Sequence, residues 1–482
     1  NRPPAAAADS WSVSAGTTLS VAAPGVLAND ADPDGDPLAA VLVSPPASGT
    51  LALLPSGAFV FTPAAGFLGN VSFLYRAEDG KGGVSASTAV TVTVTPSETE
   101  RVVPILLDAY GVGSARFRSE LVLANRGTTT ASVELTFTAA SALGASGSGT
   151  VSESLWAGRQ LVLDDALSYL RSRGLAIPQA APGASQGGTL RVRFRGLSSA
   201  DAGEAFARTT ALLPDGRAGV AYPGVAPAAW DTPLGQNVFG LREDGSSRSN
   251  LALVNLGSSG DVGLRVTLFS GTAGDRRTFV LPDTYWLAPL QWIQLSAVLG
   301  RAGFTNGYAL VERVSGSSPY YAYGVFNDNA TNDGSFIDPI PAAAGVPSRI
   351  VPVVLELGIY SSELILTNPS SSTVAVDLRY VESLSAEGAA RSAGTDSLQP
   401  REQKIVAAIP YLRSLGVDVG PAGGSYAGPV VASFSVPGRP ENGFAGGRAK
   451  SPGTGGGFYG VYYSGLGATQ TAASEAWVFG LK

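Results

Sequence analysis

Short stretches in which apolar and polar residues alternate occur along the whole chain. Residues 89–95 (AVTVTVT) place valine at every second position, and the runs VELTFT, LRVTLF and VDLRYV follow downstream. A period of two puts successive side chains on opposite faces of a β-strand, so one face is buried and the other solvated. Turn-forming Gly, Pro, Asn and Asp separate the runs. The pattern predicts an all-β fold of tandem β-sandwich domains.

Residues 1–97 form the first predicted unit. Its expected strands include TTLSV, GTLAL, GAFVFTP, VSFLYRAED and STAVTVTVT, punctuated by turns. The segments APGVLANDADPDGDPL, ASGTL and GAFVFTPAAGFLGNVSFLYRAEDGKGG resemble the cadherin-like or immunoglobulin-like tandem modules of bacterial adhesins and surface proteins. The resemblance implies a β-sandwich in a string of extracellular domains, a class whose Asp-rich loops often bind calcium.

An acidic loop lies inside this unit. Carboxylates at every second residue around Gly35 suit a hard cation that takes roughly six to eight oxygen ligands. The predicted calcium ligands are Asp30, Asp32, Asp34, Asp36 and Asp79. Asp9 and Glu78 are candidates to complete the shell. The loop is not an EF-hand, because its twelfth position is Val41, and the alternative is that Asp, Pro and Gly only form a tight turn.

The remaining chain contains three copies of a second pattern. Each copy carries Ser-x-Leu-x-Leu-x-Asn, which ends at Asn125, Asn255 or Asn368. A β run follows, and then a short amphipathic segment at nearly constant distance. Such spacing indicates an internal repeat rather than chance composition.

The amphipathic segments predict one short helix in each copy. Their glycines suit the left-handed residue that ends a helix, and their first residues suit capping or a first-turn proline. The expected starts are at Asp164 and Asp165, at Ser296 and at Pro410, and the expected stops are Gly174, Gly303 and Gly416.

Two kinds of entry strand divide the copies into types. VVPILLD and VVPVVLE are alike, whereas NVFGLRE differs, so the copies follow the order A, B, A. The predicted domains are 1–97 (cadherin-like or immunoglobulin-like sandwich), 101–230 (type A), 231–344 (type B), 345–475 (type A) and 476–482 (a terminal strand that resembles the start of type B). The copies resemble uncharacterised β-rich repeats of secreted bacterial surface proteins, above all at YAYGVFNDNATNDGSF.

The last seven residues, AWVFGLK, repeat the letters that open type B. A lone strand leaves its backbone groups unpaired, so it must pair somewhere. It is the last strand of the third copy, the opening of a further type B module, or a strand donated to the next subunit. The predicted interface residues are Trp477, Val478, Phe479 and Leu481. The start NRPPAAAADS, without an initiator Met, indicates a piece of a longer polypeptide.

Composition excludes several functions. The chain has no Cys, His or Met, which removes disulfides, thiolate chemistry, most zinc sites and histidine-based triads. Its net charge of -6 and scattered lysines argue against nucleic acid as a partner. No apolar run reaches the roughly 18 residues of a membrane span. Without Ser-x-x-Lys or Gly-x-Ser-x-Gly, we expect no enzyme.

Two further groups of residues are candidates for ligand binding. Asp328, Asp333 and Asp338 could line a cation or sugar site, although such residues are ordinary in hairpins. Aromatic residues could stack on sugars, although such rings more often pack in cores and interfaces. The aromatic clusters are Tyr285, Trp286 and Trp292, and Tyr320, Tyr321 and Tyr323.

The sequence therefore predicts an extracellular structural protein at a bacterial cell surface, a filament or fibre subunit assembled head to tail through strand or domain contacts. The alternative is a multi-domain adhesin or a string of carbohydrate-binding modules. The expected partners are copies of the chain or further domains of a longer chain, with surface glycans as an option. Calcium is the one cofactor that the sequence suggests.

Overall fold

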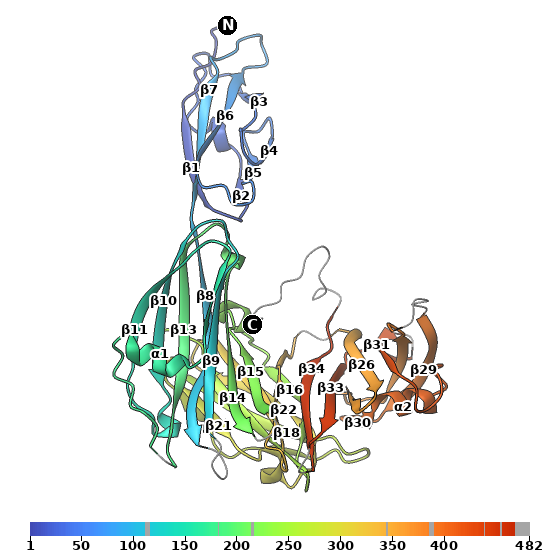
Figure 1. Cartoon of the computed structure of the whole chain (residues 1–482). Helices are drawn as coiled ribbons and strands as arrows, with labels where there is room; N and C mark the ends of the chain where they lie inside the picture. Colours follow the sequence, from blue (N-terminus) through green and yellow to red (C-terminus); the bar gives the residue numbers. More distant parts are fainter. Residues whose placement is uncertain are drawn as a thin grey trace.

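The computed structural model describes residues 1–110, 116–181, 183–213, 216–343, 346–384, 390–437, 439–453 and 456–467. Strands dominate these residues, and the predicted all-β fold of β-sandwiches is confirmed. The first module projects from one end of the repeats, and the chain enters them directly through β8 (Figure 1).

The first module is a sandwich of two sheets, ordered β1-β7-β6-β3 and β2-β5-β4. Val90, Val92 and Val94 alternate along β7 and are at most 2% exposed, so its valine face lies in the core with Phe59 and Phe73. The elements are β1 (Asp9–Ser14), β2 (Leu19–Val21), η1 (Gly25–Leu27), β3 (Ala39–Ser44), β4 (Thr50–Leu53), β5 (Phe59–Thr62), β6 (Gly69–Glu78) and β7 (Thr88–Thr95).

Repeat 1, as we name the segment β8–β15, folds into two four-stranded layers. One layer has the order β11-β10-β13-β8, the other β12-β9-β14-β15, and pairing of β8 with β9 joins them. The elements are β8 (Ser97–Tyr110), β9 (Arg116–Asn125), β10 (Ala131–Ala139), η2 (Ser141–Leu143), β11 (Gly149–Leu155), β12 (Arg159–Leu163), α1 (Ala166–Ser172), β13 (Ser185–Leu197), η3 (Ala200–Ala202), β14 (Gly203–Leu213), β15 (Gly216–Pro223) and η4 (Pro227–Trp230).

Repeat 2 and repeat 3 follow the same order of strands. In repeat 2 the layers are β19/β20-β18-β22-β16 and β21-β17-β23-β24, and β25 is added beside β16. Its elements are β16 (Gln236–Arg242), β17 (Ser247–Asn255), β18 (Val262–Ser270), β19 (Thr278–Val280), β20 (Tyr285–Leu287), β21 (Trp292–Leu295), η5 (Leu299–Ala302), β22 (Asn306–Ser315), β23 (Tyr320–Asp328), β24 (Gly334–Ile337) and β25 (Ile340–Pro341).

In repeat 3 the layers are β29-β28-β31-β26 and β30-β27-β33-β34, with β32 beside β31. Its elements are β26 (Ser348–Leu357), β27 (Tyr360–Thr367), β28 (Val374–Val381), β29 (Ala390–Leu398), β30 (Gln403–Ala407), α2 (Ala408–Ser414), β31 (Tyr426–Val436), β32 (Arg439–Pro440), β33 (Phe444–Pro452) and β34 (Phe458–Ser464). The domain limits predicted from the sequence stay a prediction.

The three landmark asparagines perform one structural task. Asn125, Asn255 and Asn368 are at most 1% exposed, and each amide nitrogen donates to a carbonyl of the following turn and to one at the end of a later strand. A buried amide must satisfy its donors, so this side chain locks the turn onto the sandwich. The recurring Asn therefore reflects structure rather than chemistry.

The predicted short helix is an α-helix in repeat 1 (α1) and in repeat 3 (α2), whereas in repeat 2 it is only a short 3₁₀ helix. There the segment is the 3₁₀ helix η5, which lacks a side-chain cap, and Ser296 does not cap it. In repeat 1 Asp165 accepts from the Ser168 amide, and Pro410 lies in the first turn of α2. The stops are confirmed, because Gly174, Gly303 and Gly416 all have positive φ.

Candidate functional site

The candidate site in the described chain is the set of buried surfaces between repeats. We call β12-β9-β14-β15 and its equivalents the outer sheet, and its solvent-side surface the trailing face. Repeats 2 and 3 each press their trailing face against the repeat before them. Pairing registers align these faces, because β9, β17 and β27 pair with β14, β23 and β33 in the same way.

Repeat 1 contacts repeat 2 through an aromatic layer. Tyr321 and Tyr323 of β23 are at most 1% exposed, and Trp292 is 4% exposed. Tyr222 of repeat 1 meets the rings of Tyr323 and Phe336 edge-on, with centroids 5.8 and 5.7 Å apart. Buried rings in this geometry contribute more than their area alone. The trailing face of repeat 2 is thus the core of an interface.

Repeat 2 contacts repeat 3 through a buried amide. Gln403 is 2% exposed; its Oε1 accepts from the Gly240 amide at 2.7 Å, and its Nε2 donates to the Gly307 carbonyl at 2.8 Å. Its backbone amide donates to Gly271. Beside it, Phe239 of repeat 2 stacks on Phe444 of repeat 3 with centroids 4.7 Å apart. Hydrogen bonds and aromatic packing together hold these two repeats against each other.

The last strands of repeats 2 and 3 also meet. Asp328 accepts from the Phe458 amide at 2.9 Å, and Asp333 accepts from the Gly460 amide at 2.7 Å. These two carboxylates therefore hold β34 in place rather than line a sugar or cation site. Asp338 lies apart from them beside Tyr321, where burial raises its pKa to about 6.

The aromatic clusters suggested for sugar binding are largely buried. Tyr320, Tyr321, Tyr323 and Trp292 are at most 4% exposed, so their rings cannot stack on a sugar in this structure. Trp286, in contrast, is 61% exposed. Residue type by itself could not separate a binding platform from an interface, because both use the same aromatic side chains.

Repeat 1 has a different trailing face. Where repeats 2 and 3 carry Tyr321 and Phe444, repeat 1 carries Glu204, whose carboxylate pairs with Arg101 at 3.0 Å. Where they carry Trp292 and Gln403, repeat 1 carries the exposed Gln160. The same face also carries half-buried Phe206, which lies opposite Val122 at the position equivalent to Tyr323, so it is mixed rather than aromatic throughout.

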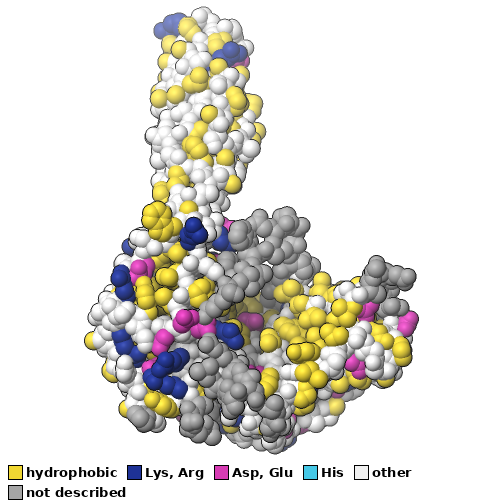
Figure 2. Space-filling model, viewed as in Figure 1, with side chains coloured by type: hydrophobic (Ala, Val, Ile, Leu, Met, Phe, Trp, Pro, Cys, Tyr) yellow, Lys and Arg dark blue, Asp and Glu magenta, His cyan; other side chains and the backbone are white. Residues whose placement is uncertain are grey.

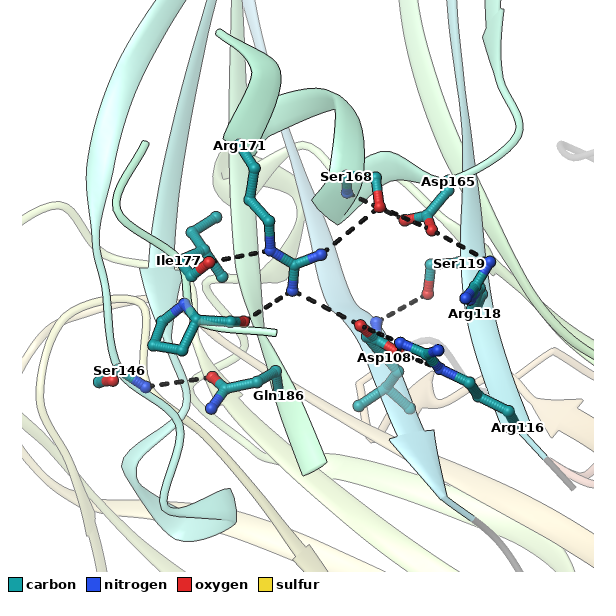
Figure 3. Close-up of polar contacts among 12 residues, drawn as sticks. Asp108, Arg116, Arg118, Ser119, Ser146, Asp165, Ser168, Arg171, Ile177 and Gln186 are labelled. Carbon is teal, nitrogen blue, oxygen red and sulfur yellow. Dashed lines mark hydrogen bonds and ion pairs between the residues drawn. The ribbon is translucent and has the colours of Figure 1, made fainter. Parts of the chain in front are cut away.

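A charged clamp fixes the helix in repeat 1 (Figure 3). Asp108 is 1% exposed and pairs with Arg116 of β9 at 2.8 Å and with Arg171 of α1 at 3.5 Å. Arg171 also donates to the carbonyls of Ile177 and Pro178. A buried carboxylate needs such partners to offset its desolvation. The clamp ties the helix and the loop after it to β8.

The same clamp recurs in repeat 3 but not in repeat 2. Arg413 pairs with Glu356 at 2.6 Å. In repeat 2 the corresponding pair is Gly300 and Glu243, and a Cβ at Gly300 would lie 3.7 Å from Glu243. One buried oxygen of Glu243 has no hydrogen-bond partner, and burial raises the pKa of this carboxyl. Loss of this arginine accompanies the change from α-helix to 3₁₀ helix.

The predicted calcium ligands lie at the free end of the first module and make separate contacts. Asp34 pairs with Arg2 at 2.8 Å, and Asp36 pairs with Lys81 at 2.6 Å. Asp32 accepts from the amides of Asp34 and Asp36, as an Asx turn does. Asp79 accepts from the amides of Lys81 and Gly83. The turn interpretation accounts for these contacts.

Asp30 and Asp9 form a second acidic group nearby. The Tyr75 hydroxyl lies 2.9 Å from Asp30, and burial together with this carboxylate raises the pKa of Tyr75. Burial and then the charge of Asp30 raise the pKa of Asp9 to about 6. One buried oxygen each of Asp9, Asp32 and Asp36 has no partner.

The fit of these carboxylates to calcium is partial. Unpartnered buried oxygens are the groups that a cation would satisfy. However, within the described residues no three Asp, Glu, His or Cys side chains gather closely enough to form a ligand set. Calcium binding by the predicted ligands stays a prediction.

The predicted interface residues Trp477, Val478, Phe479 and Leu481 lie outside the described residues. No direct signal in the sequence marks Gln403 or Phe239, which the fold brings together. Comparison of equivalent positions in the two type A copies is the signal that could have found the inter-repeat faces.

Comparison with known proteins identifies the first module. The sequence model of the bacterial cadherin-like domain matches residues 1–96. A search of curated proteins finds no match to the chain. Across the described ranges, no helix has the length and apolar character required to cross a bilayer. A bacterial cadherin-like module joined to several β-rich domains fits a cell-surface adhesin-like protein.

Proposed function

We propose that this chain is an extracellular structural protein of a bacterial surface, a filament subunit that assembles head to tail through contacts between repeats. One observation carries the proposal: consecutive repeats pack against each other through buried interfaces and are not merely connected by linkers. Aromatic packing joins repeats 1 and 2, and Gln403 with stacked Phe239 and Phe444 joins repeats 2 and 3. Such a stack resists bending and suits a load-bearing element.

The contacts between repeats within the chain also support the proposal, because they are of a kind that can extend from one chain to the next. Each contact joins a trailing face to a different surface of the preceding repeat, so it is heterologous. Heterologous contacts that do not close into a ring generate open fibres. The absence of catalysis and the role of the segment 476–482 stay predictions within this proposal.

Electron microscopy of the purified chain at low and high concentration tests the proposal, with light scattering for mass. We expect filaments whose number grows with concentration. Monomers at every concentration, with or without calcium, would contradict it and would favour a monomeric adhesin. Binding to surface glycans would then be the next function to test, with the tryptophans Trp156 and Trp286, 71% and 61% exposed, as candidate sugar-stacking rings.

Calcium at Asp30, Asp32, Asp34, Asp36 and Asp79 is a separate proposal for the first module. The unpartnered buried oxygens of Asp32 and Asp36 support it. Calcium should raise the melting temperature of this module, and Asp32→Asn should reduce that rise. Glu312→Gln serves as the control, because Glu312 lies in repeat 2. Calcium should raise the melting temperature of the first module in this variant as much as in the unmodified chain. No calcium effect on the unmodified chain would refute the proposal.

A further inference from the structure

A cavity of about 420 Å³ lies at the junction of repeats 1 and 2. Its wall on repeat 1 is largely apolar, with Leu107, Phe117 and Val220 as bulky side chains. Its wall on repeat 2 carries polar side chains, including Arg248 and Asn250. A few polar groups in a mainly apolar pocket of roughly 300–1,000 Å³ are typical of sites for small molecules. The two walls therefore fit a molecule with an apolar body and one polar group.

The junction of repeats 2 and 3 carries an ion pair at the equivalent place. Glu363 of repeat 3 is 8% exposed and pairs with Arg242 of repeat 2 at 3.0 Å and with Lys450 at 2.8 Å. These three side chains line the cavity of about 400 Å³ at this junction. A buried carboxylate and its cations offset the desolvation of one another. The second junction therefore neutralises its cations with a carboxylate of its own.

Strand registers identify the residues that stand in the place of this ion pair at the first junction. Leu107 and Arg242 each donate the backbone amide to a serine hydroxyl of the next strand at 2.8 Å, so Leu107 is equivalent to Arg242. Asn250 and Glu363 occupy the same register on the strands that lead to the landmark asparagines, so Asn250 is equivalent to Glu363. The first junction thus has a leucine and a neutral amide where the second has a cation and a carboxylate.

Arg248 supplies a cation to the wall of the first cavity. Its guanidinium donates to the side-chain oxygens of Asn329 at 2.7 Å and of Asn332 at 3.2 Å. Both acceptors are neutral amides. Burial raises the pKa of the nearby Glu243 carboxyl despite the charge of Arg248, so this acid is a weak partner for the guanidinium.

Other cations of the chain contrast with Arg248. Figure 2 shows Lys and Arg side chains (dark blue) next to Asp and Glu side chains (magenta) over repeat 1. On repeat 2, Arg265 pairs with Glu312 at 3.1 Å. A guanidinium binds a carboxylate through charge-assisted hydrogen bonds, which are about twice as strong as those to neutral groups. Arg248 is therefore the group of this cavity that a carboxylate from a ligand would satisfy.

We propose that this cavity binds a small carboxylic acid with an apolar body, such as a medium-chain fatty acid. The ligand carboxylate pairs with Arg248 and takes the role that Glu363 has at the other junction. The apolar body lies on the wall formed by Leu107, Phe117 and Val220, where its removal from water favours binding. The inference goes beyond the proposed structural role and does not depend on it.

Isothermal titration calorimetry of the full chain with decanoate tests the proposal, and decan-1-ol is the matched neutral ligand. We expect one site per chain, with decanoate bound more tightly than decanol. Arg248→Gln should weaken decanoate binding about ten- to a hundredfold and change decanol binding less than about twofold, because only decanoate loses a charged partner. Arg265→Gln removes a cation from the pair with Glu312 and should change the affinity for neither ligand.

Asn250→Glu provides a second, independent variant. It places a carboxylate of the chain at the position equivalent to Glu363, on the same cavity wall as Arg248. We expect decanoate binding to be lost while thermal melts show a folded chain, because the internal carboxylate satisfies the guanidinium. In the unmodified chain, decanoate should slow amide hydrogen exchange over residues 105–109 and 323–327, whose strands border the cavity.

Three calorimetric results would overturn the proposal. They are no measurable binding of decanoate to the unmodified chain, equal affinity for decanoate and decanol, and the same decanoate affinity in the Arg248→Gln and Arg265→Gln variants. Exchange protection confined to strands that do not border the cavity would also overturn it, because the ligand would then bind elsewhere. None of these results bears on filament formation, which microscopy measures separately.

Discussion

The buried amide of Gln403 gives the sharpest prediction about how the repeats are held together. Truncation by Gln403→Ala removes the acceptor of the Gly240 N–H and the donor to the Gly307 carbonyl. A buried group that loses its partner costs about 1–3 kcal/mol. Gln403 is 2% exposed, so the missing atoms also leave a cavity. We expect a loss of about 2–5 kcal/mol in the stability of this interface.

The chain supplies a matched control at the equivalent position of repeat 1. Gln160 occupies the same place on its sheet but is exposed, so Gln160→Ala should change stability by less than about 0.5 kcal/mol. Hydrogen exchange over residues 236–242 reports the opening free energy at the interface in both variants. Equal protection from hydrogen exchange in the two variants would refute the view that Gln403 stabilises the contact between repeats 2 and 3.

Two other predictions concern charge. Gly300→Arg should give repeat 2 the helix clamp of repeats 1 and 3, because the new arginine can pair with Glu243. The free energy of unfolding should exceed that of Gly300→Ala by about 0.5–1 kcal/mol at neutral pH. Calorimetry at neutral pH and near pH 4 measures this gain, and a gain that survives protonation of Glu243 would exclude the ion pair. Asp9 has a folded-state pKa raised from 3.8 to about 6, so the protonated form favours folding, and the stability of the first module should fall as pH rises from about 4 to about 6. Asp9→Asn should flatten that dependence in thermal melts, and an unchanged slope would mean that Asp9 is not the group responsible.

The alternating pattern of apolar and polar residues determined much of this fold by itself. A strand with valine at every second position has one face to bury, and β7 buries it. Likewise, glycines were expected where a helix must end in a left-handed residue, and Gly174, Gly303 and Gly416 adopt positive φ. These features depend on local geometry, which neighbouring residues specify on their own.

Local pattern did not distinguish the 3₁₀ helix of repeat 2 from the α-helices of repeats 1 and 3. The spacing there matches that of the other copies, but Gly300 stands where the clamp arginine stands in repeats 1 and 3. An arginine that reaches from the helix to a buried carboxylate is a long-range contact, and its absence is visible only once the strands are in register. Helix propensity alone was therefore insufficient to predict whether this segment forms an α-helix or a 3₁₀ helix.

The tertiary structure alone decided what the aromatic and amide residues do. The sequence did not show whether Tyr321, Trp292 and Gln403 lie on an open binding surface or inside an interface. Aromatic and amide side chains occur in both places, and residue type does not identify the surface that covers them. The covering surfaces come from strands more than a hundred residues away in some cases, such as Gly240 over Gln403. Sequence thus determined which residues alternate and turn, whereas only packing between repeats decided which of the resulting faces are covered, because contacts between residues far apart in the chain are not specified by local pattern.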